Sequence, residues 1–434
     1  MKIGIRRENK SKWERRVPFT PDHIKLLKEK YCIETILQPS KIRIFSDDEY
    51  KNSGAFINED LSECPVIFGI KEMPKSFFLP NKTYVFFSHV IKGQSYNMPM
   101  LQKMMDLKCN LIDYEKMVDE NDRRLIFFGR YAGIAGMIDT LWAFGQRLKY
   151  ENISDHFTEI KKAYQYESLE QAKNDLKEIG EKIQKDGIPE NITPLVCGIT
   201  GYGNVSKGVQ GILNELPIIE ITPSQLLTLS NSESVSQNHI YKVVFKEEHL
   251  VEPKERNKNF ELQDYYENPQ KYKSKFEKYI PHMSILVNCI YWESRYPKLV
   301  TKEYLKSFYQ KKKKLKLEVI GDISCDINGS VEITSKVTEP DNPAYVYNPI
   351  LDEIKEGIKG KGVVVIARDN LPCEIPRESS IFFSNALISF VPQIVEAHSS
   401  DSLDKDSLPK SIQKALIVHR GKFTKDFEYI KKYL

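Results

Sequence analysis

LVCGITGYGNVSKGVQGIL, residues 195–213, is the stretch of sequence that decides the fold. An apolar run typical of a buried strand ends at Thr200, Gly201 and Gly203 follow directly, and an apolar-periodic helical pattern begins after them. Glycines in such a turn let the backbone approach a pyrophosphate, and the amino terminus of the helix offers free N–H groups and the positive end of its dipole. The order strand, glycine turn, helix therefore predicts a dinucleotide-binding domain.

The glycine motif departs from its usual form. Ser206 stands where the third glycine is expected, and Gly208 follows two residues later. A glycine turn that only packs a helix on a strand is the alternative. We rank it lower because two later strand candidates end in polar residues, Asn288 and Asp322, and loops at strand carboxyl ends are where open α/β sheets bind ligands.

The strand candidate after this helix, PIIEIT at residues 217–222, bears on the choice of cofactor. An acidic residue at its end would accept hydrogen bonds from the adenosine ribose, but Thr222 occupies that end and Glu220 lies inside the strand. Without an acid there is no repulsion against a 2′-phosphate, which favours NADP(H). NAD(H) stays open as the alternative.

Strand-like and helical patterns alternate along most of the chain. The amino-terminal strand candidates are KIGI, IETILQ, PVIFGI, TYVFF and NLIDY, and the rhythm resumes after Pro194 with PLVCGIT, PIIEIT, YKVVF, SILVNCIYW and LEVIGDIS. This βαβ order predicts an α/β fold of two Rossmann-like domains with parallel sheets, separated by an interdomain cleft.

The predicted domains are not continuous in sequence. We expect residues 1–135 plus 350–434 to form a substrate and catalytic domain, and residues 136–349 to form the dinucleotide-binding domain. The segment 150–191 is rich in Lys and Glu and predicts a charged, solvated helical insertion. After the last apolar run, GVVVIARDNLP, we expect helices to the end of the chain.

Composition narrows the classes of partner. The 434 residues carry 64 Lys+Arg against 60 Asp+Glu, a net charge of +4, which gives no basic field for nucleic acid. No apolar run approaches the ~18 residues of a spanning helix, so no membrane partner is expected. Small-molecule chemistry on a monomer or homodimer remains as the expectation.

The seven cysteines predict neither a disulfide framework nor a metal site. They form no CxxC pair, and no histidine stands at metal-ligand spacing. The amino terminus, MKIGIRRENK, enters a strand pattern without a signal or transit pattern. We therefore expect a cytoplasmic protein with reduced thiols and no metal.

Polar residues follow several amino-terminal strand candidates. Lys71 follows PVIFGI, His89 follows TYVFFS and Glu115 follows LIDY, so in a parallel sheet their side chains converge at one edge. Arg16 and Arg124 are candidate forks for carboxylates. Each has an ordinary alternative as a solvated or structural residue, and Glu115 with Arg124 is a candidate ion pair.

Longer motifs carry a family resemblance over nearly the whole chain. The chain resembles the lysine 2-oxoglutarate reductase portion of bifunctional aminoadipic semialdehyde synthase, and it is more distantly similar to lysine-forming saccharopine dehydrogenases. Both share a fold with alanine dehydrogenase and the transhydrogenase nucleotide-binding subunit. The motifs are IRRENKSKWERRVPFTP, FFSHVIKGQ, LIDYEKMVDEN, FGRYAGIAGMID, GYGNVSKGVQGILNELP, VNCIYWE, GDISCDINGSVE and DNLPCEIPRESS.

The resemblance implies reductive condensation of the lysine ε-amine with 2-oxoglutarate by NAD(P)H to give saccharopine, or the reverse. It implies Lys71 and His89 as the acid–base pair. It also implies substrate contacts from Arg16, Glu72, Glu115 and Arg124, and dinucleotide contacts from Gly201, Gly203, Asn204, Val205, Asn288 and Asp322, to which the ribose argument adds Thr222.

The chemistry sets a condition on these two residues. Histidine suits proton transfer with its ordinary pKa of ~6.5. Lys71 suits it only if burial or nearby cations such as Arg16 lower its pKa from ~10.4. The alternatives are an alanine dehydrogenase-like amino-acid dehydrogenase and a non-catalytic NAD(P)-binding relative.

Overall fold

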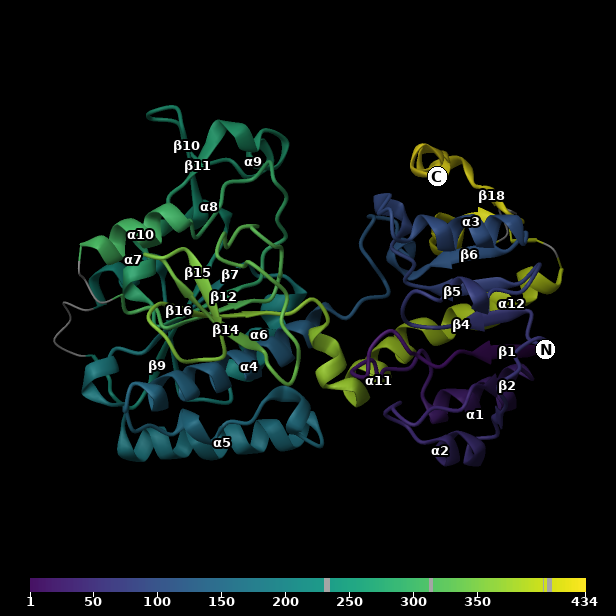
Figure 1. Cartoon of the computed structure of the whole chain (residues 1–434), viewed down its shortest axis with the longest axis horizontal. Coiled ribbons are helices and arrows are strands. Elements are labelled where there is room, and N and C mark those ends of the chain that lie inside the picture. Colours follow the sequence, from purple (N-terminus) through teal and green to yellow (C-terminus); the bar gives the residue numbers. More distant parts are fainter. Residues whose placement is uncertain (230–234, 312–314, 401, 404–407) are drawn as a thin grey trace. The chain divides into compact units, whose positions relative to one another are not determined.

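The computed structural model describes residues 1–229, 235–311, 315–400, 402–403 and 408–434. The chain forms two compact units (Figure 1). Unit 1 comprises Met1–Phe128 and Pro376–Leu434, and unit 2 comprises Gly129–Ile375. Residues 350–375, expected in the first domain, belong to unit 2 because the strand Val363–Ala367 pairs with Val319–Asp322 in its sheet.

Unit 1 is built on an eight-stranded sheet in the order β18-β17-β6-β5-β4-β1-β2-β3. Its strands are β1 (Lys2–Ile5), β2 (Glu34–Leu37), β3 (Phe56–Ile57), β4 (Val66–Phe68), β5 (Thr83–Phe86), β6 (Asn110–Asp113), β17 (Leu416–His419) and β18 (Lys422–Phe423). Its helices are α1 (Pro21–Tyr31), α2 (Asp47–Asn52), α3 (Met98–Asp106), α11 (Pro376–Leu387), α12 (Val391–Ser399) and α13 (Lys410–Ala415).

The predicted parallel pairing is confirmed for β1 to β6. The expectation of helices to the end of the chain is wrong. LIVH in β17 pairs antiparallel with β6, and β18 returns beside it. A strand this short, directly after a helix, leaves little periodic signal in the sequence.

Unit 2 holds a second eight-stranded sheet in the order β15-β14-β16-β13-β12-β7-β9-β8, and a separate hairpin, β10-β11. The strands are β7 (Val196–Thr200), β8 (Ile218–Ile221), β9 (Ile240–Phe245), β10 (Val251–Pro253), β11 (Tyr272–Ser274), β12 (Ile285–Asn288), β13 (Val319–Asp322), β14 (Ala344–Asn348), β15 (Glu353–Glu356) and β16 (Val363–Ala367). The helices are α4 (Gly129–Tyr150), α5 (Leu169–Asp186), α6 (Asn204–Leu213), α7 (Pro223–Thr228), α8 (Glu247–Leu250), α9 (Leu262–Glu267) and α10 (Lys302–Gln310).

The strand order of this sheet differs from the one assumed in the sequence argument. β9 lies between β7 and β8 and pairs parallel with both. The strand that follows the glycine-turn helix in sequence, β8, is therefore at the edge of the sheet. The strand beside the glycine turn is β9.

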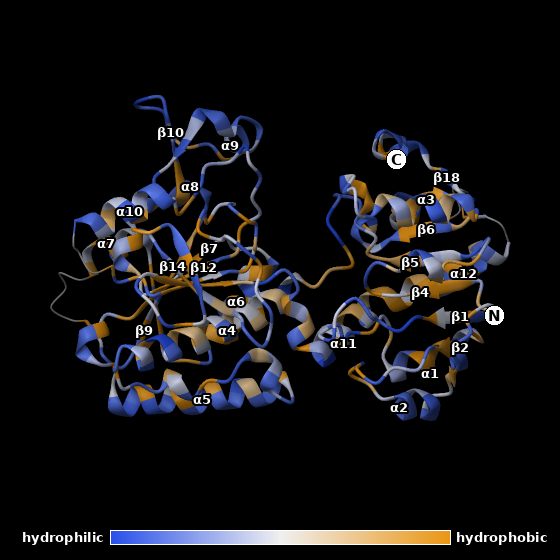
Figure 2. Cartoon of the chain, in the orientation of Figure 1, coloured by the Kyte–Doolittle hydropathy of each residue, from blue (hydrophilic) through white to orange (hydrophobic). Residues whose placement is uncertain are grey.

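The two sheets supply the cores of their units, and their strands are mostly apolar (Figure 2). The charged segment 150–191 takes part in the core of unit 2. In α5 one face is polar, while Leu176, Ile179 and Ile183 on the other face are at most 2% exposed. The segment is helical, but the helix covers the core with an amphipathic face instead of standing free in solvent.

One described helical stretch, Pro376–Ser399, is long and apolar enough to cross a membrane by length and composition. Serines and amides interrupt its apolar residues, so it is not a continuous apolar run. Phe383, Leu387 and Ile394 in this stretch are 0% exposed and belong to the core of unit 1. Because core helices meet the same criterion, the stretch is weak evidence for a membrane.

Helices α4 and α6 of unit 2 touch through their backbones. A Cβ at Gly208 would lie 2.0 Å from the carbonyl oxygen of Arg130, and one at Gly133 would lie 2.0 Å from that of Val205. Gly208 therefore fulfils the packing role usually given to the third glycine of the motif, from a position two residues later.

We expect Gly208→Ala to lower the free energy of unfolding of unit 2 by about 1–3 kcal/mol, because the new methyl group must push α6 away from α4. Gly211→Ala in the same helix is the matched control. Its Cβ would meet no atom within 4 Å, and the change is expected to be neutral or slightly stabilising. Urea denaturation measures both, and equal stability of the two variants would contradict this packing.

Candidate functional site

The glycine turn in unit 2 has the backbone expected of a dinucleotide site. Gly201 has φ +84°, and its N–H donates to the carbonyl of Phe245 over 2.9 Å. At Gly203 a Cβ would meet no atom within 4 Å, so one side of the turn is open to an approaching group. Asn204 and Val205 begin α6, where backbone N–H groups lack intrahelical acceptors. The turn therefore fits a diphosphate.

Asn288 and Asp322 end β12 and β13, as predicted, but their side chains are buried and bonded to each other. Asn288 Nδ2 donates to Asp322 Oδ1 over 2.8 Å, and Thr200 Oγ1 donates to Asn288 Oδ1 over 2.7 Å. Burial raises the pKa of Asp322 to about 6, although Thr334 and Asn288 donate to its carboxylate. This network fixes the ends of three neighbouring strands next to the turn.

Thr222 lies away from the glycine turn. It follows the edge strand β8, and its hydroxyl caps α7 by accepting from the backbone N–H of Gln225 over 3.2 Å. The premise that placed Thr222 beside the turn is wrong, because β9 separates β8 from β7.

In unit 1 Lys71, His89 and Glu115 leave the sheet at one edge as predicted, and the convergence of their side chains stays a prediction. They follow β4, β5 and β6, which are adjacent and parallel. Their backbones therefore leave the sheet at the same edge.

Glu8 joins the loops that leave the carboxyl ends of β1 and β4, which we call the exits of these strands. Its buried carboxylate accepts the backbone N–H of Ile70 over 2.7 Å and that of Lys71 over 3.2 Å, and Arg6 lies 3.5 Å away. Burial raises the pKa of Glu8 to about 7, against the opposing effect of Arg6. This carboxylate fixes the backbone that carries Lys71.

Glu72 joins the exits of β4 and β5. Its carboxylate bonds to His89 Nδ1 over 2.7 Å and to the Lys10 ammonium over 2.7 Å. Burial acts to raise the pKa of Glu72, but hydrogen bonds from His89 and Lys10 outweigh it and hold that pKa at about 2. The ionised Glu72 therefore fixes the proton of His89 on Nδ1 and leaves Nε2 for chemistry.

His89 itself has a left-handed backbone with φ 54°. Non-glycine residues adopt this region rarely, and such conformations cluster at functional sites.

The condition set for Lys71 is met. Burial lowers its pKa from the ordinary 10.5, and the positive charge of Arg16 lowers it further, while Glu14 and Glu72 oppose the shift. Arg16 acts here through its charge. Its guanidinium is 2% exposed, forms two bonds of 2.7 and 2.6 Å with Glu14, and lies over the ring of Phe128 at 4.2 Å.

Glu115 and Arg124 form an ion pair, which is the alternative considered for them. Glu115 is 6% exposed and Arg124 is 53% exposed. With Lys116, Asp426 and Tyr429 they line a pocket of about 360 Å³ in unit 1. Asp113 fixes this exit by accepting the backbone N–H groups of Ser88 and Glu115 over 3.0 and 2.8 Å.

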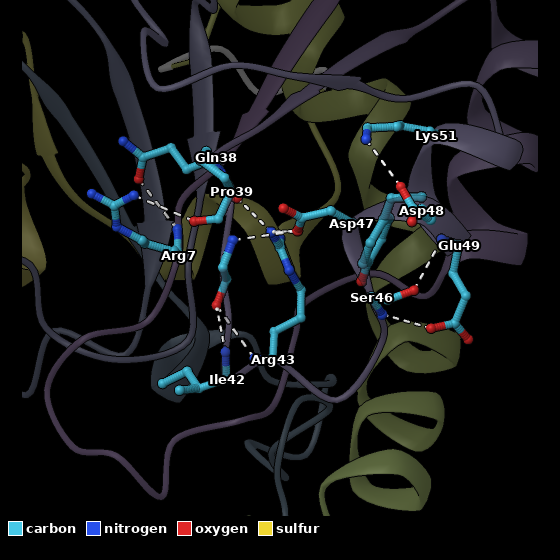
Figure 3. Close-up of polar contacts among 12 residues, drawn as sticks. Arg7, Gln38, Pro39, Ile42, Arg43, Ser46, Asp47, Asp48, Glu49 and Lys51 are labelled. Atoms are coloured by element: carbon cyan, nitrogen blue, oxygen red, sulfur yellow. Dashed lines mark hydrogen bonds and ion pairs between the residues drawn. The ribbon is translucent and has the colours of Figure 1, made fainter.

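The exit of β2 is held beside that of β1 (Figure 3). The backbone N–H of Arg7 donates to Gln38 Oε1 over 3.2 Å, and Arg43 donates to Asp47 Oδ1 over 2.6 Å. A pocket of about 580 Å³ opens here, next to Glu8. Arg7, Lys12 and Lys41 line it together with Asp47 and Glu59.

The sequence argument did not identify Glu8, Lys10 or Glu14, although all three contribute to this site. The signal available was for Glu8, which stands three residues after the first strand, as Lys71 and His89 stand three residues after theirs, while Lys10 and Glu14 lie further along the same loop. Within the described ranges, no group of three or more His, Cys, Asp or Glu side chains could hold a metal ion, and all seven cysteines are free thiols.

The high pKa of Glu8 makes the stability of unit 1 depend on pH. Between the ordinary value of 4.5 and about 7, the folded state holds a proton that the unfolded state has lost, so stability falls as pH rises through this window. Gln cannot titrate. We expect the stability of Glu8→Gln relative to the unmodified protein to rise by up to about 3 kcal/mol from pH 5 to pH 8.

Urea denaturation followed by circular dichroism at both pH values measures this difference. Glu29→Gln, on the exposed face of α1, is the control and is expected to show no such change. A Glu8→Gln difference that is the same at pH 5 and pH 8 would contradict the assignment.

Two models of known protein families match this chain. Residues 4–135 match the alanine dehydrogenase/PNT N-terminal domain and residues 225–426 match the alanine dehydrogenase/PNT C-terminal domain. Among solved structures, an L-alanine dehydrogenase covers 100% of this chain and 99% of its own at TM-score 0.63 and 16% identity. A transhydrogenase from Sinorhizobium meliloti covers 98% of this chain and 100% of its own at TM-score 0.57 and 15% identity. These structures show the fold.

Sequence relatives are closer. An alpha-aminoadipic semialdehyde synthase of Arabidopsis thaliana is 38% identical over 99% of this chain and 41% of its own length. The mitochondrial one of Mus musculus is 33% identical over 99% of this chain and 47% of its own. A saccharopine dehydrogenase [NAD(+), L-lysine-forming] of Emericella nidulans is 26% identical over 92% of this chain and 93% of its own.

The chain thus spans less than half the length of the synthases that it matches. The resemblance predicted from the motifs is confirmed. The chain belongs to the alanine dehydrogenase/PNT family.

Proposed function

We propose that this protein is a saccharopine-forming lysine 2-oxoglutarate reductase, an NAD(P)-dependent oxidoreductase acting on CH–NH bonds. The observation that carries the proposal is the Lys71–Glu72–His89 arrangement at one sheet edge, where one amine has a lowered pKa and one imidazole has a fixed tautomer. The name of the lysine-forming saccharopine dehydrogenases supplies lysine and saccharopine, and the family resemblance of the motifs implies 2-oxoglutarate as the second substrate.

The reaction requires two proton carriers. Lys71, with its lowered pKa, takes the proton from the lysine ε-amine so that the amine can add to the keto carbon. His89 Nε2, which carries no proton while Nδ1 donates to Glu72, takes a second proton from the added nitrogen, and Lys71 and His89 then return the two protons to the keto oxygen, which leaves as water. A bound NAD(P)H would supply the hydride that reduces the resulting imine, and the backbone of Gly201, Gly203, Asn204 and Val205 would hold its diphosphate.

The arginines have different parts in this proposal. Arg124 is half exposed while it is paired with Glu115, so its remaining N–H groups can bind a substrate carboxylate. Arg16 is buried against Glu14, and we assign to it the lowering of the Lys71 pKa instead of a direct contact. Glu72 and Glu115 would orient the lysine substrate by their charge.

For the cofactor we propose a preference for NADP(H) over NAD(H). The name of the fungal relative gives NAD(+), so a preference for NADP(H) would have to come from this chain's own residues. Since Thr222 does not neighbour the glycine turn, other residues must carry the selection.

We further propose that the enzyme works in the cytosol as a monomer or homodimer. Seven free thiols suit a reducing compartment. Cell fractionation and sedimentation test these two points.

Lys71→Met and His89→Gln are each expected to lower kcat by roughly 10²–10⁴-fold, because general acid–base catalysis has this magnitude. The exposed Lys103→Met on α3 is the control and should keep full activity. Initial rates of NADPH oxidation over a range of pH measure the effect. A loss under about threefold in both variants would remove them from these roles.

The substrate class is tested by NADPH and NADH oxidation with 2-oxoglutarate across a panel of amines. We expect activity that depends on lysine and a product with the mass of saccharopine. Activity on alanine and pyruvate without lysine dependence would support an alanine dehydrogenase-like enzyme. Dinucleotide binding without any turnover would support a non-catalytic relative.

A further inference from the structure

We infer that the adenosine ribose of the dinucleotide is read by Lys246 and Glu247, the two residues after β9, and not by Thr222. The inference rests on the proposed function. Its starting point is the order β12-β7-β9-β8 in the sheet of unit 2.

In dinucleotide-binding sheets the ribose is read from the strand that neighbours the glycine-turn strand. That neighbour is β9. Thr200, the last residue of β7, stands opposite Phe245, the last residue of β9, and the N–H of Gly201 donates to the carbonyl of Phe245 over 2.9 Å. The residues that leave β9 therefore lie next to the turn, whereas Thr222 lies one strand, about 4.8 Å, further out.

Glu247 contacts Tyr202 of the glycine turn and Tyr266 of α9. Its Oε1 accepts the hydroxyl of Tyr266 over 2.7 Å, and the hydroxyl of Tyr202 interacts with the same carboxylate. Tyr202 stands between Gly201 and Gly203 and is 45% exposed. The turn that fits the diphosphate and the carboxylate after β9 are thus one connected structure.

Lys246 contributes the opposite charge. It is exposed, and among the described residues no ion pair holds its ammonium. The 2′-phosphate that distinguishes NADP(H) would be attracted by Lys246 and repelled by Glu247. The free 2′-hydroxyl of NAD(H) would donate to Glu247 and gain nothing from Lys246. Lys246 therefore favours NADP(H) over NAD(H), and Glu247 favours NAD(H) over NADP(H).

Isothermal titration calorimetry of the full chain with NADP⁺ and NAD⁺ tests this without relying on activity. Lys246→Gln is expected to weaken NADP⁺ binding by about tenfold and to change the affinity for NAD⁺ by less than about twofold. Glu247→Gln is expected to strengthen NADP⁺ and weaken NAD⁺, each by about threefold or more. Thr222→Val and the exposed Lys254→Gln should leave the affinity ratio unchanged.

The outcomes separate the two proposals. If the unmodified protein binds neither dinucleotide, the proposed function fails and the inference fails with it. If the unmodified protein binds a dinucleotide, but Lys246→Gln and Glu247→Gln leave the ratio of the NADP⁺ and NAD⁺ affinities unchanged, the inference is overturned and the proposed function stands. A change of this ratio in Thr222→Val instead has the same meaning.

Discussion

Three carboxylates tie together the exits of four neighbouring strands in unit 1, and the candidate catalytic geometry depends on them. Glu8 holds the exit of β1 to that of β4, Glu72 holds β4 to β5, and Asp113 holds β5 to β6. Parallel pairing brings these exits to one edge, but pairing alone leaves the loops free to diverge. The carboxylates bind backbone N–H groups and an imidazole, so they fix the positions of the Lys71 backbone and the His89 ring.

These carboxylates are chemically unequal because their partners differ. Glu8 is buried and has a pKa raised to about 7, whereas Glu72 receives hydrogen bonds from a histidine and a lysine that hold its pKa at about 2. Environments that separate the pKa values of neighbouring titratable groups are typical of acid–base sites. Burial and Arg16 lower the pKa of the Lys71 amine at the same edge, as a proton carrier near neutral pH requires.

Much of this was predictable from residue patterns. Branched runs such as PVIFGI and TYVFF, with polar residues directly after them, predicted both the strands and the edge of the sheet that carries Lys71 and His89. What failed were inferences that need long-range pairing. The order of β9 and β8 beside β7 depends on pairing between distant segments, which a local sequence pattern does not encode. The pairing of Arg16 with Glu14 likewise could not be predicted from spacing, because Arg15 and Arg16 both follow Glu14 and the sequence does not say which one pairs with it.

The glycine motif shows how a departure in sequence can preserve the physical requirement. Ser206 is buried where a glycine is usual, and the close contact between α4 and α6 is made instead by Gly208 and Gly133. The turn keeps its open side at Gly203. The missing third glycine weakens the match to the dinucleotide-binding motif, whereas the close packing of α6 on α4 agrees with that motif.

Partial burial at the sheet edge of unit 1 and the charge of Arg16 lower the pKa of Lys71. The most direct measurement is competitive acetylation of the folded protein as a function of pH, with the modified lysines quantified by mass spectrometry. The account predicts that Lys71 titrates below the ordinary 10.5 and that unfolding in urea restores the ordinary value. Titration of Lys71 at or above 10.5 in the folded protein would contradict it.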